Sequence, residues 1–273
     1  MQEIYMSDTI FPPHLVVKAM RDSGFKNAAY AISELIDNSV DADAKQIELL
    51  CAEQSSTGGW QKRIQEIAVI DDGNGMDEQT LMNALEFGNG VNLDKKNNKS
   101  IGKFGFGLPN SSISQCKRLE VWSWQNGIES SIHTYIDVDE ISKGEMIKVP
   151  QPKIKSLPKT YKTISKILGK KGTLVLWTKF DKITWKTAAT IIKHSENLIG
   201  RIYRYQLNKK LKIRMTGFNL ENYAINEDKY AIPNDPMYLM KNTSCPSPWD
   251  KEAMFKEHAE PVLLKVKHDG DDY

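Results

Sequence analysis

Apolar and polar residues follow two different periods along this chain. Between Asn27 and Asp41, apolar side chains recur at spacings of three and four, which predicts an amphipathic helix with its apolar stripe at Ile32, Leu35, Ile36 and Val40. Residues 46–52 and 66–72 are instead short, largely apolar runs, QIELLCA and EIAVIDD, typical of buried strands. An α/β fold is therefore predicted.

The remaining elements follow the same two patterns. We expect further helices at 14–23, 77–88 and 185–210, the second with Asp77 as its N-cap. Further strands are expected at 119–138 (two strands joined by a turn at Asn126-Gly127), 172–180 and 210–217. Residues 143–171 hold nine lysines, one glutamate and three prolines, which is typical of an irregular, exposed connection. A loop-rich stretch near 235–250 suggests one domain over 1–235, with an N-terminal arm, and a following module, cut short, over 236–273.

Composition excludes several classes of protein. The net charge of +2 gives no global electrostatic reason for nucleic-acid binding. The three cysteines are far apart, no CxxC pair occurs and the five histidines do not cluster, so neither a disulfide framework nor a zinc site is expected. No signal peptide and no apolar run near the ~20 residues that span a bilayer is found, so we expect a cytoplasmic protein without a membrane partner.

The predicted helix at 27–41 carries an acidic stripe. Glu34, Asn38 and Asp41 are spaced i, i+4 and i+7 and lie beside its apolar stripe, with no basic residue between Ala31 and Ala44. A carboxylate here could deprotonate a water, and an amide oxygen could ligate a hard cation such as Mg²⁺. A solvated acidic face would give the same pattern.

A second candidate is the strand end at 67–76, IAVIDDGNGM. Asp71 could accept a hydrogen bond from an exocyclic amine, and Gly73 and Gly75 would let a flat ring approach the backbone near Met76. An ordinary turn after a strand would also explain these residues. Thr173, which follows Gly172 at the start of a strand, could pair with the same base edge or could simply favour the strand.

A third candidate is IGKFGFGLPNSS, which begins at residue 101. Its glycines have the spacing GxxGxG before a predicted helix, so their backbone amides could bind phosphate oxygens, with Lys103 adding a cation. No GxxxxGK[ST] motif occurs, which argues against the P-loop class.

Taken in order, these motifs resemble the GHKL nucleotide-binding superfamily, which includes DNA gyrase, the heat-shock chaperone, histidine kinases and MutL. The match spans roughly residues 25–180. The resemblance implies a two-layer α/β sandwich of the Bergerat type, a mixed sheet with helices on one face. It also implies ATP and Mg²⁺ as ligands, with a metal ion supplying the positive charge that the acidic helix lacks.

The resemblance also implies roles for individual residues. Glu34 matches the general base, Asn38 the Mg²⁺ ligand and Asp71 the adenine-binding aspartate. Asp41 matches an acid of the helix motif with a structural role. The other implied nucleotide contacts are Gly73, Gly75, Met76, Gly102, Lys103, Gly105, Gly107 and Thr173.

Within the superfamily, EFGNGV before the lid and GTLVLW after it look most like MORC ATPases and their bacterial relatives. Pro109 stands where MORC lids tend to carry lysine, which leaves Lys103 or Lys99 as candidates to contact the γ-phosphate. The likeness implies slow ATP hydrolysis, ATP-driven lid closure and an N-terminal homodimer, with the arm before Pro12 as a strap. A histidine-kinase-type phosphotransferase and a nucleotide-gated binding module without useful turnover remain as alternatives.

One basic segment falls outside these motifs. Residues 201–214, RIYRYQLNKKLKIR, contain six basic residues, two tyrosines and no acid. They could contact nucleic-acid phosphates or form a solvated helix face. Nucleic acid could also be bound by the part of the protein that follows this chain.

Overall fold

The computed structural model describes residues 13–55, 62–88, 106–255, 267–268 and 271–272. The helices in these ranges are α1 Pro13–Ser23, α2 Ala28–Asp41, α3 Glu78–Leu85, α4 Gly107–Ile113, α5 Val138–Ser142, α6 Lys159–Ile164, α7 Ala188–Ile202 and α8 Arg204–Asn208. The strands are β1 Gln46–Ser55, β2 Lys62–Asp71, β3 Cys116–Trp124, β4 Ile132–Asp137, β5 Lys153–Ile154, β6 Gly172–Phe180, β7 Lys212–Asn219, β8 Ile225–Tyr230, β9 Lys267–His268 and β10 Asp271–Asp272.

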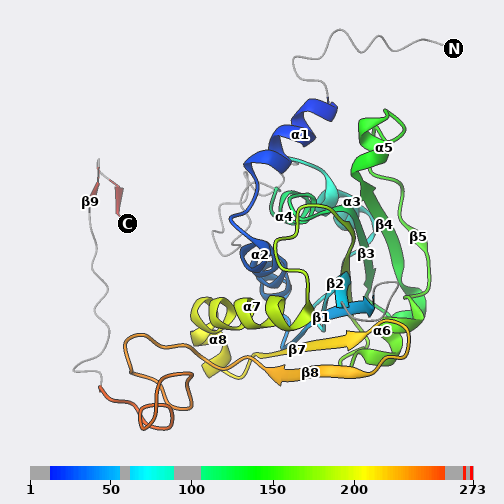
Figure 1. Ribbon diagram of the computed structural model, residues 1–273. Helices are drawn as coiled ribbons and strands as arrows, with labels where there is room; N and C mark the ends of the chain where they lie inside the picture. Colours follow the sequence, from blue (N-terminus) through cyan, green and yellow to red (C-terminus); the bar gives the residue numbers. More distant parts are fainter. Residues whose placement is uncertain (1–12, 56–61, 89–105, 256–266, 269–270, 273) are drawn as a thin grey trace, which may run out of the picture.

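Eight of these strands form one sheet in the order β5-β4-β3-β6-β2-β1-β7-β8 (Figure 1). The sheet is mixed, because β1 and β7 run parallel while the other neighbouring pairs are antiparallel. This confirms the predicted α/β class with a mixed sheet. β2 lies near the middle and pairs with both β1 and β6, so its end is surrounded by other elements.

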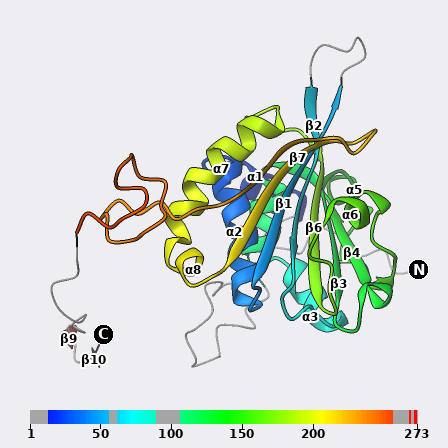
Figure 2. The same ribbon diagram turned by 90° about the horizontal axis from the view of Figure 1, so that it is seen from below.

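The longer helices cover one face of the sheet (Figure 2). Buried residues of α1, α2, α3, α4 and α7 join those of β1, β2, β6 and β7 in one hydrophobic core. The stripe predicted for α2 is buried as expected, with Ile32 and Ile36 fully inaccessible and Leu35 almost so. α2 is thereby fixed against the sheet, and its other side is available for chemistry.

The opposite face of the sheet has a smaller cover. Here α6 and the chain around it bury Leu157, Tyr161 and Ile164 against Trp122, Phe218 and neighbouring sheet residues. The interpretation of 143–171 as an exposed connection was therefore wrong for this part. Its lysines masked three apolar residues, spaced four and three apart: Leu157 lies just before α6, and Tyr161 and Ile164 lie on the buried side of that helix.

Two further differences concern helix and strand ends. The long helix predicted at 185–210 ends at Ile202 and resumes as α8, because the Tyr203 side chain turns inward and its hydroxyl donates to Ser33 O at 2.7 Å. The predicted tight turn at Asn126-Gly127 is a longer connection that contains the 3₁₀ helix Ile128–Ser130. β8 was not predicted, since its sequence INEDKY lies at the sheet edge with no buried position.

The division at residue 235 stays a prediction. In the described part of 236–255 the chain forms turns, and Asp235 accepts hydrogen bonds from the backbone of Met237, Leu239 and Met240. None of the described helices is long and apolar enough to cross a membrane.

Candidate functional site

The centre of the candidate site is Asp71, at the end of β2. Its side chain is only 4% exposed. One carboxylate oxygen accepts from the Ser39 hydroxyl of α2 at 3.0 Å, and the other accepts from the backbone N–H of Gly73 at 2.9 Å. Burial, which disfavours the charged form, raises the pKa of Asp71 to about 7, although these two hydrogen bonds oppose the shift. A buried carboxylate with oxygen lone pairs to spare is suited to accept a ligand's N–H.

The glycines after Asp71 are required by close backbone approaches. Gly75 has φ +64°, and a Cβ there would lie 2.2 Å from the carbonyl oxygen of Trp124. A Cβ at Gly73 would lie 2.9 Å from both Ala42 O and Asp71 Oδ1. Any side chain at Gly73 would therefore push against the carboxylate itself.

Thr173 is joined to the same site through the sheet. It is the register partner of Asp71 on β6, and its hydroxyl lies 3.1 Å from that of Ser123. Ser123 Oγ in turn accepts from the backbone N–H of Met76 at 2.8 Å. Sequence reasoning named Thr173 and Met76 but missed Ser123, which connects them, and Ser39, which holds Asp71. Both serines are buried, and only their position in space marks them.

Glu34 and Asn38 lie on the side of α2 that faces away from the core. Glu34 is half-buried, and burial, followed by the nearby charges of Asp37 and Asp41, raises its pKa. Asn38 is exposed and uses its amide nitrogen to donate to Glu34 O at 2.8 Å. Its amide oxygen is thus the atom available to a cation or a water.

The acidic stripe is not a uniformly solvated face. Asp37 accepts from the Tyr203 hydroxyl at 2.6 Å, so this carboxylate ties α2 to the start of α8. Burial raises the pKa of Asp37, and the Tyr203 hydrogen bond partly offsets that shift. Asp37 therefore has a structural partner of its own, whereas Glu34 faces Gly107.

Gly107, the first residue of α4, packs directly on Glu34. A Cβ at Gly107 would lie 2.0 Å from Glu34 Oε1. A few residues away, a Cβ at Gly88 would lie 2.5 Å from the Phe106 ring, so the chain before residue 89 meets the chain after residue 105. Gly102, Lys103 and Gly105, along with Lys99, lie outside the described residues.

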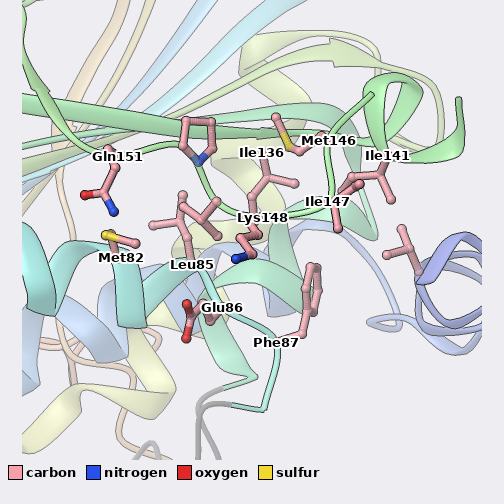
Figure 3. Close-up of a pocket in the computed structure, with 13 residues that line it drawn as sticks. Met82, Leu85, Glu86, Phe87, Ile136, Ile141, Met146, Ile147, Lys148 and Gln151 are labelled. Carbon is pink, nitrogen blue, oxygen red and sulfur yellow. The ribbon is translucent and has the colours of Figure 1, made fainter. Parts of the chain in front are cut away.

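A separate cavity of about 790 Å³ has none of the predicted site residues among the described residues that line it (Figure 3). Its lining is mostly apolar and comes from α1, α3, β4, α5 and the chain at 146–151: Val17, Met82, Leu85, Glu86, Phe87, Ile136, Ile141, Met146, Ile147, Lys148, Val149, Pro150 and Gln151. Such walls do not suit a highly charged ligand. This cavity is therefore not a candidate for a highly charged ligand.

Comparison with known proteins decides the family. Residues 26–173, more than half of the chain, match the family described as histidine kinase-, DNA gyrase B-, and HSP90-like ATPase. The chain belongs to this ATPase family. The matched residues include Glu34, Asn38, Asp71 and Thr173, and the predicted superfamily is confirmed.

The chain is similar to several ATPase-family members. It is 31% identical over 150 residues to the DNA mismatch repair protein MutL of Paramagnetospirillum magneticum, and 25% identical over 176 residues to the ATPase morc-1 of Caenorhabditis elegans. These alignments cover 54% and 59% of this chain but only 23% and 20% of the relatives. A crystal structure of the N-terminal domain of a DNA repair protein aligns with 79% of this chain and 54% of its own, at a TM-score of 0.40 and 15% identity.

The raised pKa of Asp71 makes a prediction about the stability of this ATPase domain. A carboxyl whose pKa is raised on folding binds more protons in the folded state, so its stabilising contribution is complete below about pH 4 and is lost as pH rises through about 7. In Asp71→Asn this dependence is absent. From about pH 4 to about pH 7, we expect the free energy of unfolding of the variant to rise relative to that of the unchanged protein. Above about pH 7 the difference between the two proteins should stay constant. Denaturant titrations at several pH values measure this difference. A difference independent of pH would contradict the raised pKa.

Proposed function

We propose that this chain binds ATP with Mg²⁺ and hydrolyses the γ-phosphate slowly. The observation that carries the proposal is the buried Asp71. Its carboxylate accepts from the backbone N–H of Gly73 and from Ser39, which lies on α2. The same helix, α2, presents Glu34 and Asn38. The group proposed to recognise a base, at the end of β2, is thus hydrogen-bonded to the helix that carries the group proposed to activate water. Membership of the ATPase family supports the assignment.

In this proposal Asp71 accepts the exocyclic amine of adenine. The ring lies beside the backbone of Gly73 and Gly75, and Thr173 and Met76 complete the contact. Because ligand binding supplies a hydrogen-bond donor to the charged carboxylate, it lowers the pKa of Asp71. The charged form of Asp71, which burial disfavours in the empty site, is therefore the form that binds adenine.

Mg²⁺ would be held by the Asn38 oxygen together with phosphate oxygens and water. Among the described residues, no group of three or more His, Cys, Asp or Glu could hold a metal ion by itself. That fits Mg²⁺, which is commonly bound through one or two protein ligands plus substrate phosphates. The bound cation would also neutralise part of the acidic stripe on α2.

Glu34 is the proposed general base for the attacking water. Its raised pKa brings it closer to the operating pH, where a base is most effective. Contact with Gly107 fixes its position relative to α4. The phosphate contacts proposed for Gly102, Lys103, Gly105 and Gly107 follow from the GxxGxG spacing alone.

Likeness to MORC ATPases supports a further step, in which ATP closes a lid over the site and drives an N-terminal homodimer. Hydrolysis would then time the opening of this clamp. Nucleic acid is one candidate for what such a clamp acts on.

The adenine assignment is tested by Asp71→Asn. The amide keeps the size of the side chain but turns one acceptor into a donor, which leaves a buried polar group mispaired at a cost of ~1–3 kcal/mol. We expect ATP affinity, measured by calorimetry near pH 8, to fall by about ten- to a hundredfold.

The matched control is Asp72→Asn. Asp72 accepts from the backbone N–H groups of Lys45 and Gln46 at 2.7 and 2.8 Å and is not part of the proposed base contact. Its variant should lose stability but keep its affinity for ATP. Unchanged affinity in Asp71→Asn, or equal losses in both variants, would exclude Asp71 as the adenine contact.

A further inference from the structure

α2 and α7 lie beside each other (Figure 1), and a groove of about 410 Å³ is lined by residues around the start of α2 and along α7. None of its described lining residues belongs to the proposed ATP site. It is lined by Lys26, Asn27, Ala29, Tyr30, Trp185, His194, Asn197, Leu198, Arg201 and Asn234. In the described part of the chain, this lining has two permanent cations, three asparagines and no carboxylate. A ligand of this groove is therefore expected to be an anion with hydrogen-bonding groups.

The two cations are available to such a ligand. In the part of the chain that the structure describes, neither Lys26 nor Arg201 forms an ion pair. Lys229, on nearby β8, is instead paired with Glu196 of α7. Two unpaired cations in one groove repel each other, and a phosphate bound between them would attract both and offset that repulsion.

Aromatic rings add a second kind of contact. Trp185 and His194 are stacked, with ring centroids 4.1 Å apart and planes 8° from parallel, and His194 remains exposed. Tyr30 is 41% exposed, and the Lys26 ammonium lies 5.9 Å from the centre of its ring. Flat, exposed rings beside cations are the surface on which bases of a single nucleic-acid strand stack.

The arginines of the basic segment at 201–214 differ in whether a ligand can reach them. Arg201 lines the groove. The next basic residue, Arg204, has its guanidinium carbon 4.4 Å from the ring centre of the exposed Tyr205. Arg204 and Tyr205 thus continue the cationic and aromatic surface along α8. Arg214, by contrast, is 2% exposed and is paired with Glu48 and Asp228 inside the fold. Of these three arginines, only Arg201 and Arg204 can therefore contact a ligand.

We propose that this groove binds single-stranded nucleic acid, with a phosphate between Lys26 and Arg201 and a base against Tyr30. A phosphorylated peptide would use the two cations but would leave the rings without partners. Tyr30 precedes Glu34 by one helical turn, on the same side of α2. The bound strand would thus run beside the end of the helix that carries the proposed general base.

The test measures binding of a fluorescently labelled oligothymidylate, longer than the ~4–16 nucleotides of one single-strand site, by anisotropy over a range of salt concentrations. Each phosphate contact on a single strand contributes about −0.7 to the slope of log K against log salt. Lys26→Gln/Arg201→Gln should therefore weaken binding and, because both cations contact one phosphate, reduce the magnitude of that slope by about 0.7. Tyr30→Leu should weaken binding by roughly tenfold or more, with little change in slope.

The matched control is Lys153→Gln/Lys159→Gln, which removes the same charge from exposed sites on β5 and at the start of α6. It should bind the oligonucleotide like the unchanged protein, and calorimetry with ATP verifies that every variant is folded. Equal losses in the control would mean binding by overall charge alone and would overturn the proposal. So would an unchanged Tyr30→Leu variant, or a phosphoserine peptide that displaces the oligonucleotide at equal concentration.

Discussion

Glu34→Gln is expected to retain ATP and to release phosphate about a hundred- to ten-thousandfold more slowly. Glutamine keeps the length of the side chain, so its packing on Gly107 is preserved, but it cannot take a proton from water. Because a general base contributes mainly in the transition state, the affinity for ATP should stay close to its original value. Phosphate release over time and calorimetry on the same protein give the two numbers.

The same variant also tests the clamp. If ATP binding drives dimerisation and hydrolysis reverses it, the slow variant should sediment as a dimer long after the unchanged protein has returned to monomer. Glu145→Gln, at an exposed position after α5, is the control for loss of one acidic charge and should behave like the unchanged protein. Normal turnover in Glu34→Gln would show that Glu34 is only an acidic residue of the helix. Slow turnover without a dimer would keep the base and remove the clamp.

Sequence alone could predict those parts of this site that depend on one local segment. The helical stripe of α2 puts Glu34 and Asn38 together because their spacing is fixed by the helix. The apolar run of β2 ending at Asp71 and the start of β6 at Thr173 are likewise local patterns, and the sheet register then makes these two residues partners. The motifs therefore predicted individual members of the candidate site, each on its own helix or strand.

The connections between elements could not be predicted in this way. Ser39 reaches Asp71 across 32 positions of sequence, and Ser123 reaches Thr173 across 50. A serine has no periodicity or charge that reports such a contact, so only the packing of α2 and β3 against their neighbours reveals it. The inward turn of Tyr203, which ends α7, depends on Ser33 and Asp37 in the same way.

Gly107 has a packing role in addition to the role that its motif suggests. The GxxGxG spacing suggests a glycine chosen for backbone contact with phosphate, and that remains a proposal. The packing adds a steric reason, because even one methyl group at this position would overlap the carboxylate of Glu34. Binding of phosphate and positioning of the base would thus depend on one small residue.

Gly107→Ala is therefore expected to damage hydrolysis by displacing Glu34. The added Cβ would lie 2.0 Å from Glu34 Oε1, so the carboxylate or α4 must move by an ångström or more. A shift of that size in a catalytic group costs on the order of a hundredfold in rate. The overlap should also lower the melting temperature, whereas affinity for ATP should fall less than the rate does, because none of the residues proposed to contact adenine belongs to α4.

The double variant Glu34→Ala/Gly107→Ala separates the overlap from other effects of alanine at position 107. Truncation of Glu34 leaves room for the new methyl group, so the second substitution should cost little stability in that background. Thermal melts of the two single variants and the double variant give the coupling between the positions, which is expected at about 0.5–3 kcal/mol for residues in contact. If Gly107→Ala lowers stability equally in both backgrounds, its effect arises from the backbone of α4 and not from Glu34, and the steric link between the two residues would be excluded.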